Sequence, residues 1–339
     1  MLPAMSTAAD PVASYLQTFE ALRARKRWST QSVTFRFVAL SLGAAASTIG
    51  YDRLERAATD LRKRARWSSP LKSEIRYVVA AMILRRGLDT APIHECVFAT
   101  RDAFKEHKVP SRGTGPTLAA LLMALHGEGT PVPDEHVERL AIIYRRWRTE
   151  HRWLTNAGDL PAAALHASRD VPVDVLAADI ERAYTRLHNA DFTRGQQLQL
   201  VSQLLAVDPR GTDAGVDRFC DVAERLRSRE ERVRPSRYDE VALLALTQSP
   251  AAEVVDRVLD NRDRLRKAKS RPDKSVAFTL AAGIELSADT ERAGERNAGD
   301  LAALQSIQAI LDAQQAATIA AISAGGAAGA AAGASAGAH

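Results

Sequence analysis

The sequence predicts an all-α protein built from stacked pairs of helices. Short, nearly all-apolar segments alternate with longer segments that carry apolar residues along one side, and a short segment begins every 35 to 45 residues. Strand-forming runs are scarce, since aromatic residues make up only 5% of the chain. A period near forty is typical of two-helix solenoid units, in which each pair buries its apolar helix against its neighbours.

Residues 191–208 show this unit most clearly. Leu198, Val201, Leu204 and Leu205 recur at helical spacing, and further apolar residues fill the remaining sides. A helix that is apolar almost all round must be buried on several faces. A Pro-Arg-Gly turn follows, and the next helix has one apolar stripe and many charges.

Three helices are expected before the pairs begin. Asp10-Pro11 supplies an N-cap followed by proline at the first helical position, so the first helix runs to about residue 27. The next two are expected at residues 30–47 and 51–66. The short helices of six pairs then begin near Leu71, Pro116, Leu160, Gly195, Arg237 and Lys274. Their longer partners begin near Pro92, Pro133, Val173, Gly211 and Pro250, and the sixth partner is expected at Leu301–Leu311.

The expected organisation has three parts. Residues 1–68 form a basic helical segment, residues 69–323 an array of about six helix pairs, and residues 324–339 a disordered Ala/Gly-rich tail. Identity between the pairs is low. An irregular helical bundle and a closed α/α toroid are therefore alternatives to the α-solenoid-like superhelix.

Cysteine usage and the chain ends predict a cytoplasmic protein. Cys96 and Cys220 lie far apart on apolar helical faces and form no disulfide framework. The first ten residues lack the basic and apolar regions of a secretory signal. The uncharged segment from Ala316 onward consists mainly of Ala, Gly and Ser, which is too weakly apolar for integral membrane insertion.

Positive charge is concentrated in the N-terminal half. Residues 1–170 contain 25 Lys and Arg against 17 Asp and Glu, whereas residues 171–339 contain 21 against 24. Leu22–Ser29 and Leu61–Ser68 are near copies of one another, 39 residues apart, and a third basic cluster lies at residues 144–153. All 4 Trp residues lie in these clusters. The candidate anion-binding residues are Arg23, Arg25, Lys26, Arg27, Trp28, Arg62, Lys63, Arg64, Arg66, Trp67, Arg145, Arg146 and Trp147.

Two interpretations of these clusters remain open. Arginines beside tryptophan bind phosphates or carboxylates and offer a stacking surface, as in nucleic-acid-binding proteins. Cations at the end of a helix also interact favourably with its dipole, and Arg stacks on Trp without a ligand. We prefer the second interpretation, because the net charge of +5 is modest for a dedicated nucleic-acid binder.

The sequence carries no recognised catalytic, nucleotide-binding or metal-binding motif, and we predict no cofactor. Residues 111–115 lack the spacing and the lysine of a phosphate-binding loop. His94, Glu95 and Cys96 are adjacent on a helix and point in different directions, which does not suit a shared metal ion. His126 and His166 lie near the ends of short apolar helices, where packing is the simpler role.

Several short motifs resemble an uncharacterised bacterial family that is known only as a domain of unknown function. They are Trp153-Leu154-Thr155, Leu160-Pro161-Ala162-Ala163, and Phe192, Gly195, Leu198-Gln199, Ser202 and Leu204-Leu205. The resemblance covers most of residues 10–290 and implies a helical, cytoplasmic bacterial protein without an established activity. The family commonly has His where this chain has Gln203. We expect Gln199, Ser202 and Gln203 to satisfy polar groups between stacked helices rather than to line a groove.

These observations predict a non-enzymatic helical-repeat scaffold or adaptor that binds a macromolecular partner, most simply a protein. Binding of nucleic acid or another polyanion through the Arg/Trp clusters is one alternative. An enzyme of the α/α-toroid type acting on a small molecule is the other.

Overall fold

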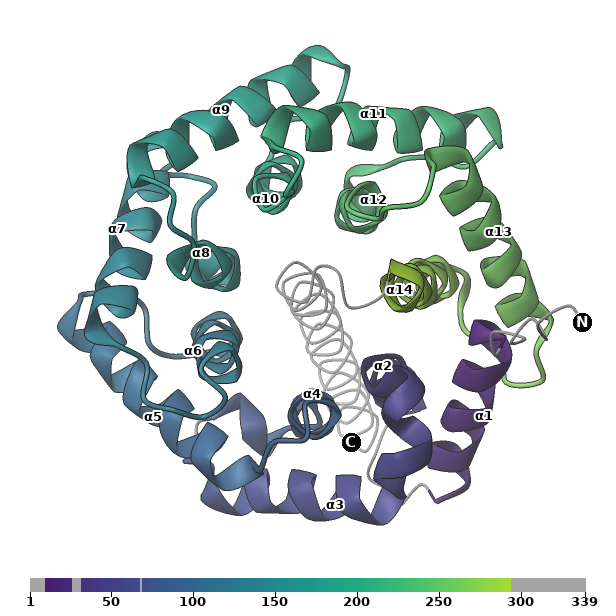
Figure 1. Cartoon of the computed structure of the whole chain (residues 1–339), viewed down its shortest axis with the longest axis horizontal. Helices are drawn as coiled ribbons and strands as arrows, with labels where there is room; N and C mark the ends of the chain where they lie inside the picture. The colour runs from purple at the N-terminus through teal and green to yellow at the C-terminus, as the bar shows by residue number, and fades with distance from the viewer. Residues whose placement is uncertain (1–9, 26–31, 68, 294–339) are drawn as a thin grey trace, which may run out of the picture. The chain divides into compact units, whose positions relative to one another are not determined.

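The described part of the chain is all-α, which confirms the predicted fold class. The computed structural model describes residues 10–25, 32–67 and 69–293, and no strand occurs among them (Figure 1). These residues fall into two compact units. Within them, unit 1 comprises residues 10–25, 42–51 and 178–293, and unit 2 comprises residues 32–41, 52–67 and 69–177.

The helices expected before the pairs are present. They are α1 (Pro11–Ala24), α2 (Ser32–Leu42), the short 3-10 turn η1 (Gly43–Ala45) and α3 (Ala46–Arg64). Asp10 caps α1 as predicted, because its carboxylate accepts hydrogen bonds from the backbone N–H groups of Val12 (3.1 Å) and Ala13 (3.4 Å). Gly50 interrupts the helical backbone within α3 at a φ of 66°, a conformation that glycine adopts without a Cβ clash.

The helices of the predicted pairs begin close to the expected positions. The apolar members are α4 (Ile75–Arg85), α6 (Thr114–His126), α8 (Leu160–Ala167), α10 (Gln196–Leu205), α12 (Tyr238–Ala245) and α14 (Lys274–Ala293). Their longer partners are α5 (Thr90–Glu106), α7 (Asp134–Glu150), α9 (Val173–Asn189), α11 (Thr212–Ser228) and α13 (Ala251–Lys267). The 3-10 turns η2 (Pro70–Lys72), η3 (Ala157–Asp159) and η4 (Pro235–Arg237) precede α4, α8 and α12. The partner expected at Leu301–Leu311 and the tail at residues 324–339 lie outside the described residues.

In unit 2 the apolar and amphipathic helices pack in two layers. The apolar helices α6 and α8 contact each other, and so do the long helices α5 and α7. Between the layers, α5 contacts α6 and α7 contacts α8. All of α6 from Pro116 to Leu125 is buried, as its nearly continuous apolar sequence predicts. The long helices bury one stripe only. In α7 this stripe includes Val137, Leu140 and Tyr144.

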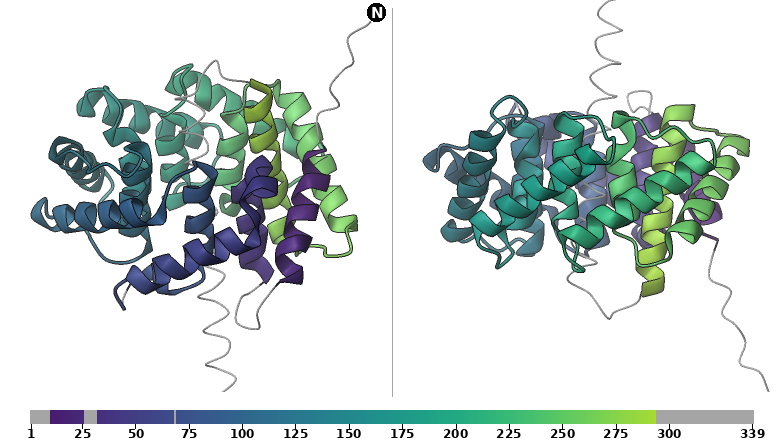
Figure 2. Two further views of the ribbon diagram at one scale, coloured as in Figure 1. Left: turned by 60° about the horizontal axis from the view of Figure 1, so that its bottom comes forward. Right: turned by 90° about the horizontal axis from the view of Figure 1, so that it is seen from above.

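Unit 1 repeats this arrangement with α10, α12 and α14. Helix α12 contacts both α10 and α14, and the long helices α11 and α13 pack against each other and against α12 (Figure 1). Helix α1 lies against α13 and α14 (Figure 2). An ion pair between Asp10 and Arg264 joins the start of α1 to the end of α13. The first described helix therefore packs against the last two described helices.

Arginine contacts to backbone carbonyls recur between successive pairs. Arg139 of α7 donates to the carbonyl of Val171, and Arg218 of α11 donates to the carbonyl of Ser249. In both cases a long helix is tied to the loop that follows the next short helix. These contacts satisfy carbonyls of the loops, which lie beyond the hydrogen-bond pattern of the helices.

Candidate interaction surface

The second basic cluster lies at the C-terminal end of α3 in unit 2. Leu61 and Ala65 are buried there, whereas Arg62, Lys63 and Arg66 are exposed. At the end of α3, helical spacing turns Leu61 toward the core and Arg62 and Lys63 outward, and Arg66 is exposed just beyond the helix. Trp67 follows the helix and is 92% exposed, which is unusual for so large an apolar side chain.

The cations of this cluster differ in how they are paired. Arg64 is held by Asp60 at 2.9 Å and lies 3.9 Å from Glu95. Arg62 and Lys63 make no side-chain hydrogen bond or ion pair with any residue that the structure describes. These two positive charges therefore remain available to a partner.

Helix α5 adds an aromatic ring and a further guanidinium beside Arg66. The guanidinium carbon of Arg66 lies 5.3 Å from the centroid of the Phe98 ring, and that of Arg101 lies 5.7 Å from the same centroid. Arg101 also donates through Nε and Nη2 to the carbonyl of Ser111, at 2.9 and 2.7 Å. We name Arg62, Lys63, Arg66, Trp67, Phe98 and Arg101 the basic-aromatic surface.

The pKa of Arg101 reflects this environment. Burial has the largest effect and lowers the pKa of the guanidinium, the carboxylate of Asp102 raises it, and the positive charge of Arg66 lowers it. The Asp102 carboxylate thus outweighs the effect of Arg66 on the pKa of Arg101. Neither Phe98 nor Arg101 was among the predicted site residues, because nothing in the local sequence reveals contacts made between two helices.

The third basic cluster does not form a comparable surface. Trp147 is only 2% exposed and packs edge-on against His166, with ring centroids 6.0 Å apart. Its ring is therefore not accessible to a ligand, contrary to the stacking role considered for it. Arg145 donates to the carbonyl of His107 at 3.1 Å, and Arg146 pairs with Glu150 at 2.9 Å.

A second exposed tryptophan lies just beyond that cluster. Trp153 is 92% exposed, and the guanidinium carbon of Arg152 lies 5.7 Å from its ring. The Arg152-Trp153 pair was visible in the sequence as part of the third cluster. Exposure, which the sequence pattern does not report, distinguishes it from Trp147.

The first basic cluster is only partly described. Arg23 lies 3.7 Å from Glu20 on the same helix, and the guanidinium of Arg25 lies 6.0 Å from the centroid of the Tyr51 ring. Lys26, Arg27 and Trp28 lie outside the described residues. In the second cluster, by contrast, the described residues include Trp67.

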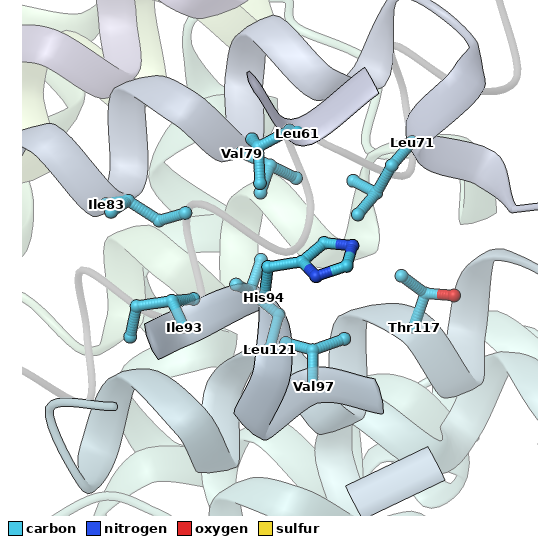
Figure 3. Close-up of a pocket in the computed structure, with 9 residues that line it drawn as sticks. All are labelled: Leu61, Leu71, Val79, Ile83, Ile93, His94, Val97, Thr117 and Leu121. Carbon is cyan, nitrogen blue, oxygen red and sulfur yellow. The ribbon is translucent and has the colours of Figure 1, made fainter. Parts of the chain in front are cut away.

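A small apolar cavity in unit 2 surrounds His94. Figure 3 shows the imidazole among apolar side chains from several elements, including Leu61, Leu71 and Val97. The cavity volume is about 10 Å³, room for about one water molecule. His94 Nε2 has no hydrogen-bond partner in the described part of the chain, and burial lowers the pKa of the ring, as does Arg64. The cavity is too small for an organic ligand.

The polar residues of α10 are buried. Gln199, Ser202 and Gln203 are each 1% exposed or less, and the Ser202 hydroxyl donates to the carbonyl of Leu198 at 2.9 Å. Their burial argues against an open groove at these positions, and the expected role in satisfying polar groups is seen for the Ser202 hydroxyl.

Glu240 of α12 is the most strongly perturbed acid in unit 1. Its Oε1 accepts a hydrogen bond from the Thr279 hydroxyl at 2.7 Å, and its Oε2 has no partner among the residues described. Burial raises the pKa of this carboxyl well above 4.5, and the neighbouring Asp239 raises it further. The folded protein therefore favours the neutral acid.

The Glu240→Gln variant is expected to be at least as stable as the parent protein at neutral pH. Because the pKa of Glu240 is higher in the folded than in the unfolded state, its contribution to stability falls as pH rises above 4.5. Glutamine keeps the shape and removes the titration. Urea denaturation at about pH 5 and about pH 7.5 should show a flatter pH dependence for the variant. The substitution Glu224→Gln, at an exposed position on α11, is the control, and equal pH dependence in all three proteins would contradict the prediction.

Neither a metal site nor a membrane span is found in the described part of the chain. Within residues 10–25, 32–67 and 69–293, no three His, Cys, Asp or Glu side chains gather closely enough to hold a metal ion. None of the helices in these ranges combines the length and the apolar character that a bilayer span requires.

Comparison with known proteins identifies the family. Neither the curated proteins nor the solved structures gave a match to this chain. A family model does match, over residues 18–316, and its description is "Protein of unknown function (DUF4003)". This agrees with the resemblance seen in the motifs from Trp153 to Leu205. Since the model matches most of the sequence, the chain belongs to this family of unknown function.

Proposed function

We propose that this protein is a helical-repeat adaptor that binds an acidic segment of a protein partner through the basic-aromatic surface. The observation that carries the proposal is the 92% exposed Trp67 beside the exposed cations Arg62, Lys63 and Arg66. Tryptophan and arginine supply a large share of the binding energy in protein interfaces, because they combine apolar area with directed hydrogen bonds.

Two further observations support the helical-repeat part of the proposal. Short apolar helices open the pairs at a spacing near forty residues, and the contacts of Arg139 and Arg218 recur at matching places. Stacked pairs of this kind present extended surfaces for binding. The free thiols of Cys96 and Cys220 support the cytoplasmic location that we propose with it.

A protein partner is favoured over nucleic acid on the grounds of charge. The N-terminal half has 25 Lys and Arg against 17 Asp and Glu, a smaller excess than is usual for nucleic-acid-binding domains. In addition, Arg64 and Arg146 are already paired with carboxylates. The remaining free cations suit a short acidic segment better than a long phosphate backbone.

The enzyme alternative rests on weaker support. An α/α toroid needs its first helix to meet its last pair, and α1 does contact α13 and α14. However, the buried acids of α14 are occupied. Glu285 pairs with Arg257 at 2.8 Å and Arg292 at 2.7 Å, and Asp289 accepts hydrogen bonds from Gln248 and Ser249. Carboxylates held in this way act as structural ties.

Fluorescence anisotropy with labelled poly-glutamate tests the proposal. The full chain should bind this probe, and the double variant Arg62→Glu/Lys63→Glu should bind it about tenfold more weakly or worse. The variant Trp67→Ala should also lose affinity although no charge changes. The matched control is Arg232→Glu/Arg234→Glu, which reverses two exposed arginines of unit 1.

Single-stranded DNA is the competing probe, measured at two salt concentrations. If DNA binds more tightly than poly-glutamate, with a steep loss of affinity at the higher salt concentration, the protein-partner proposal is overturned in favour of nucleic acid. Equal binding of poly-glutamate by the parent protein and by the Arg62→Glu/Lys63→Glu variant would also reject it.

A further inference from the structure

Two guanidinium groups from different segments lie near one aromatic ring of the basic-aromatic surface. Arg66 lies just beyond the end of α3 and Arg101 lies in α5, and their guanidinium carbons are 5.3 and 5.7 Å from the Phe98 centroid. Phe98 itself is partly exposed. Both cations therefore lie close to one aromatic ring that is partly open to solvent.

Arg66 forms a long ion pair with Asp102 and makes no side-chain hydrogen bond with any residue that the structure describes. Its side chain is 66% exposed, and its nearest described carboxylate, Asp102, lies 3.9 Å away, too far for a hydrogen bond. Asp102 is instead held by Lys105 at 2.5 Å. Among the described residues, the N–H donors of the Arg66 guanidinium therefore carry no hydrogen bond, and Asp102 is the carboxylate nearest to them.

The guanidinium of Arg101 is held in one orientation, which favours the binding of an anion. Its Nε and Nη2 both donate to the carbonyl of Ser111, which fixes the plane of the guanidinium. Its Nη1 makes no hydrogen bond with any other described residue. A guanidinium that is already immobilised loses less entropy when it binds a ligand.

The two guanidinium groups suit an anion that offers several acceptors. The Asp102 carboxylate lies 3.9 Å from Arg66 and offsets the effect of Arg66 on the pKa of the partly buried Arg101, so the number of acceptor atoms, and not repulsion between the arginines, favours one anion over another. A single carboxylate pairs well with one guanidinium, whereas a phosphate monoester carries about −1.5 to −2 charges at neutral pH and three acceptor oxygens. A phosphate group therefore provides acceptors for both arginines, in competition with the Asp102 carboxylate.

Building on the proposed function, we infer that Arg66 and Arg101, held around Phe98, form a binding site for a phosphorylated side chain of the protein partner. Trp67, next to Arg66 in the chain and 92% exposed, supplies apolar contact to the residues that flank the phosphate. Arg62 and Lys63 contact acidic residues of the same segment. The adaptor would then bind its partner according to the phosphorylation state of that partner.

The test compares three versions of one acidic peptide, which carry serine, glutamate or phosphoserine at a central position. With the full chain, the phosphoserine peptide should bind about tenfold more tightly than the other two. Arg66→Gln and, separately, Arg101→Gln should remove this preference. Because Arg101 also holds the Ser111 loop, the exposed Arg66 is the decisive position. Arg64→Gln removes the same charge two residues away, from a residue already paired with Asp60, and should keep the preference.

The outcomes separate this inference from the proposed function. If the serine peptide binds and depends on Arg62 and Lys63, but phosphorylation adds nothing or Arg66→Gln leaves the preference intact, the phosphate site is wrong and the adaptor proposal stands. If the serine peptide does not bind at all, the adaptor proposal fails. Displacement of a bound peptide by inorganic phosphate, without any preference for phosphoserine, would indicate a free-phosphate site and overturn the inference.

Discussion

The Gly115→Ala variant is expected to lose about 3 kcal/mol of unfolding free energy or more. A Cβ at this position would lie 2.0 Å from the carbonyl oxygen of Ala157 and 2.9 Å from its carbonyl carbon. The opposing backbone belongs to η3, which is fixed by hydrogen bonds of 2.7 Å between Asn156 and Asp159, and between Asn156 and Gly158. Neither side of the contact can move without losing other interactions.

A loss of stability in Gly115→Ala would indicate the close contact with η3, because the same substitution usually has the opposite effect. In an unconstrained helix, replacing Gly by Ala normally stabilises by about 1 kcal/mol, because alanine restricts the unfolded chain. Urea denaturation of Gly115→Ala and Gly113→Ala distinguishes two causes of lost stability. The first variant tests the steric clash with η3, and the second tests the cost of a positive φ. Gly113 has a φ of 93°, and a Cβ added there would have no atom within 4 Å, so its substitution should cost only about 1–2 kcal/mol. A Gly115→Ala protein as stable as the parent would refute the close contact between α6 and η3.

The Phe219→Ala variant is expected to lose about 3–5 kcal/mol of unfolding free energy. Phe219 is fully buried in α11, where it forms an edge-to-face cluster with Phe192, at 4.9 Å between ring centroids, and with Tyr238, at 6.2 Å. Phe192 and Tyr238 also contact each other, at 5.5 Å. The residue therefore joins α11 to the start of α12 and to the segment that precedes α10.

Thermal and urea denaturation check this prediction. Removing the ring leaves a cavity among three elements that are tied by other contacts, so collapse around it is limited. Trp67→Ala is the comparison, because it removes a larger side chain from an exposed position and should change stability by less than about 0.5 kcal/mol. Similar losses in the two variants would show that Phe219 does not hold these elements together.

Local patterns determined the helices of this chain. The N-cap at Asp10 and the prolines near the helix starts mark boundaries through the backbone conformations they allow, and these constraints act within a few residues. The contrast between short apolar and long amphipathic helices also predicted which side chains are buried. In α7 the stripe of Val137, Leu140 and Tyr144 continues to Trp147, and that spacing accounts for the burial of Trp147.

The same kind of local pattern failed to define the candidate site. Trp67 and Trp147 both follow an arginine, yet one is 92% and the other 2% exposed. Trp147 is part of a helix that packs along its full stripe, whereas Trp67 lies beyond the end of α3, which stops at Arg64. The sequence also did not reveal which arginines are paired with a carboxylate. Glu95 approaches Arg64 and Asp102 approaches Arg66, and both acids belong to α5.

The sequence by itself determined the all-α class, the order and approximate limits of the helices and the location of the basic clusters. These properties depend on side-chain spacing and on backbone preferences within single segments. Only the tertiary structure decided that Phe98 and Arg101 of α5 lie beside Arg66 of the α3 end, that Gly115 touches the backbone of η3, and that Glu240 is buried against Thr279. These contacts join residues from different helices, and they depend on how each helix is rotated and placed against its neighbour, which local periodicity leaves undetermined.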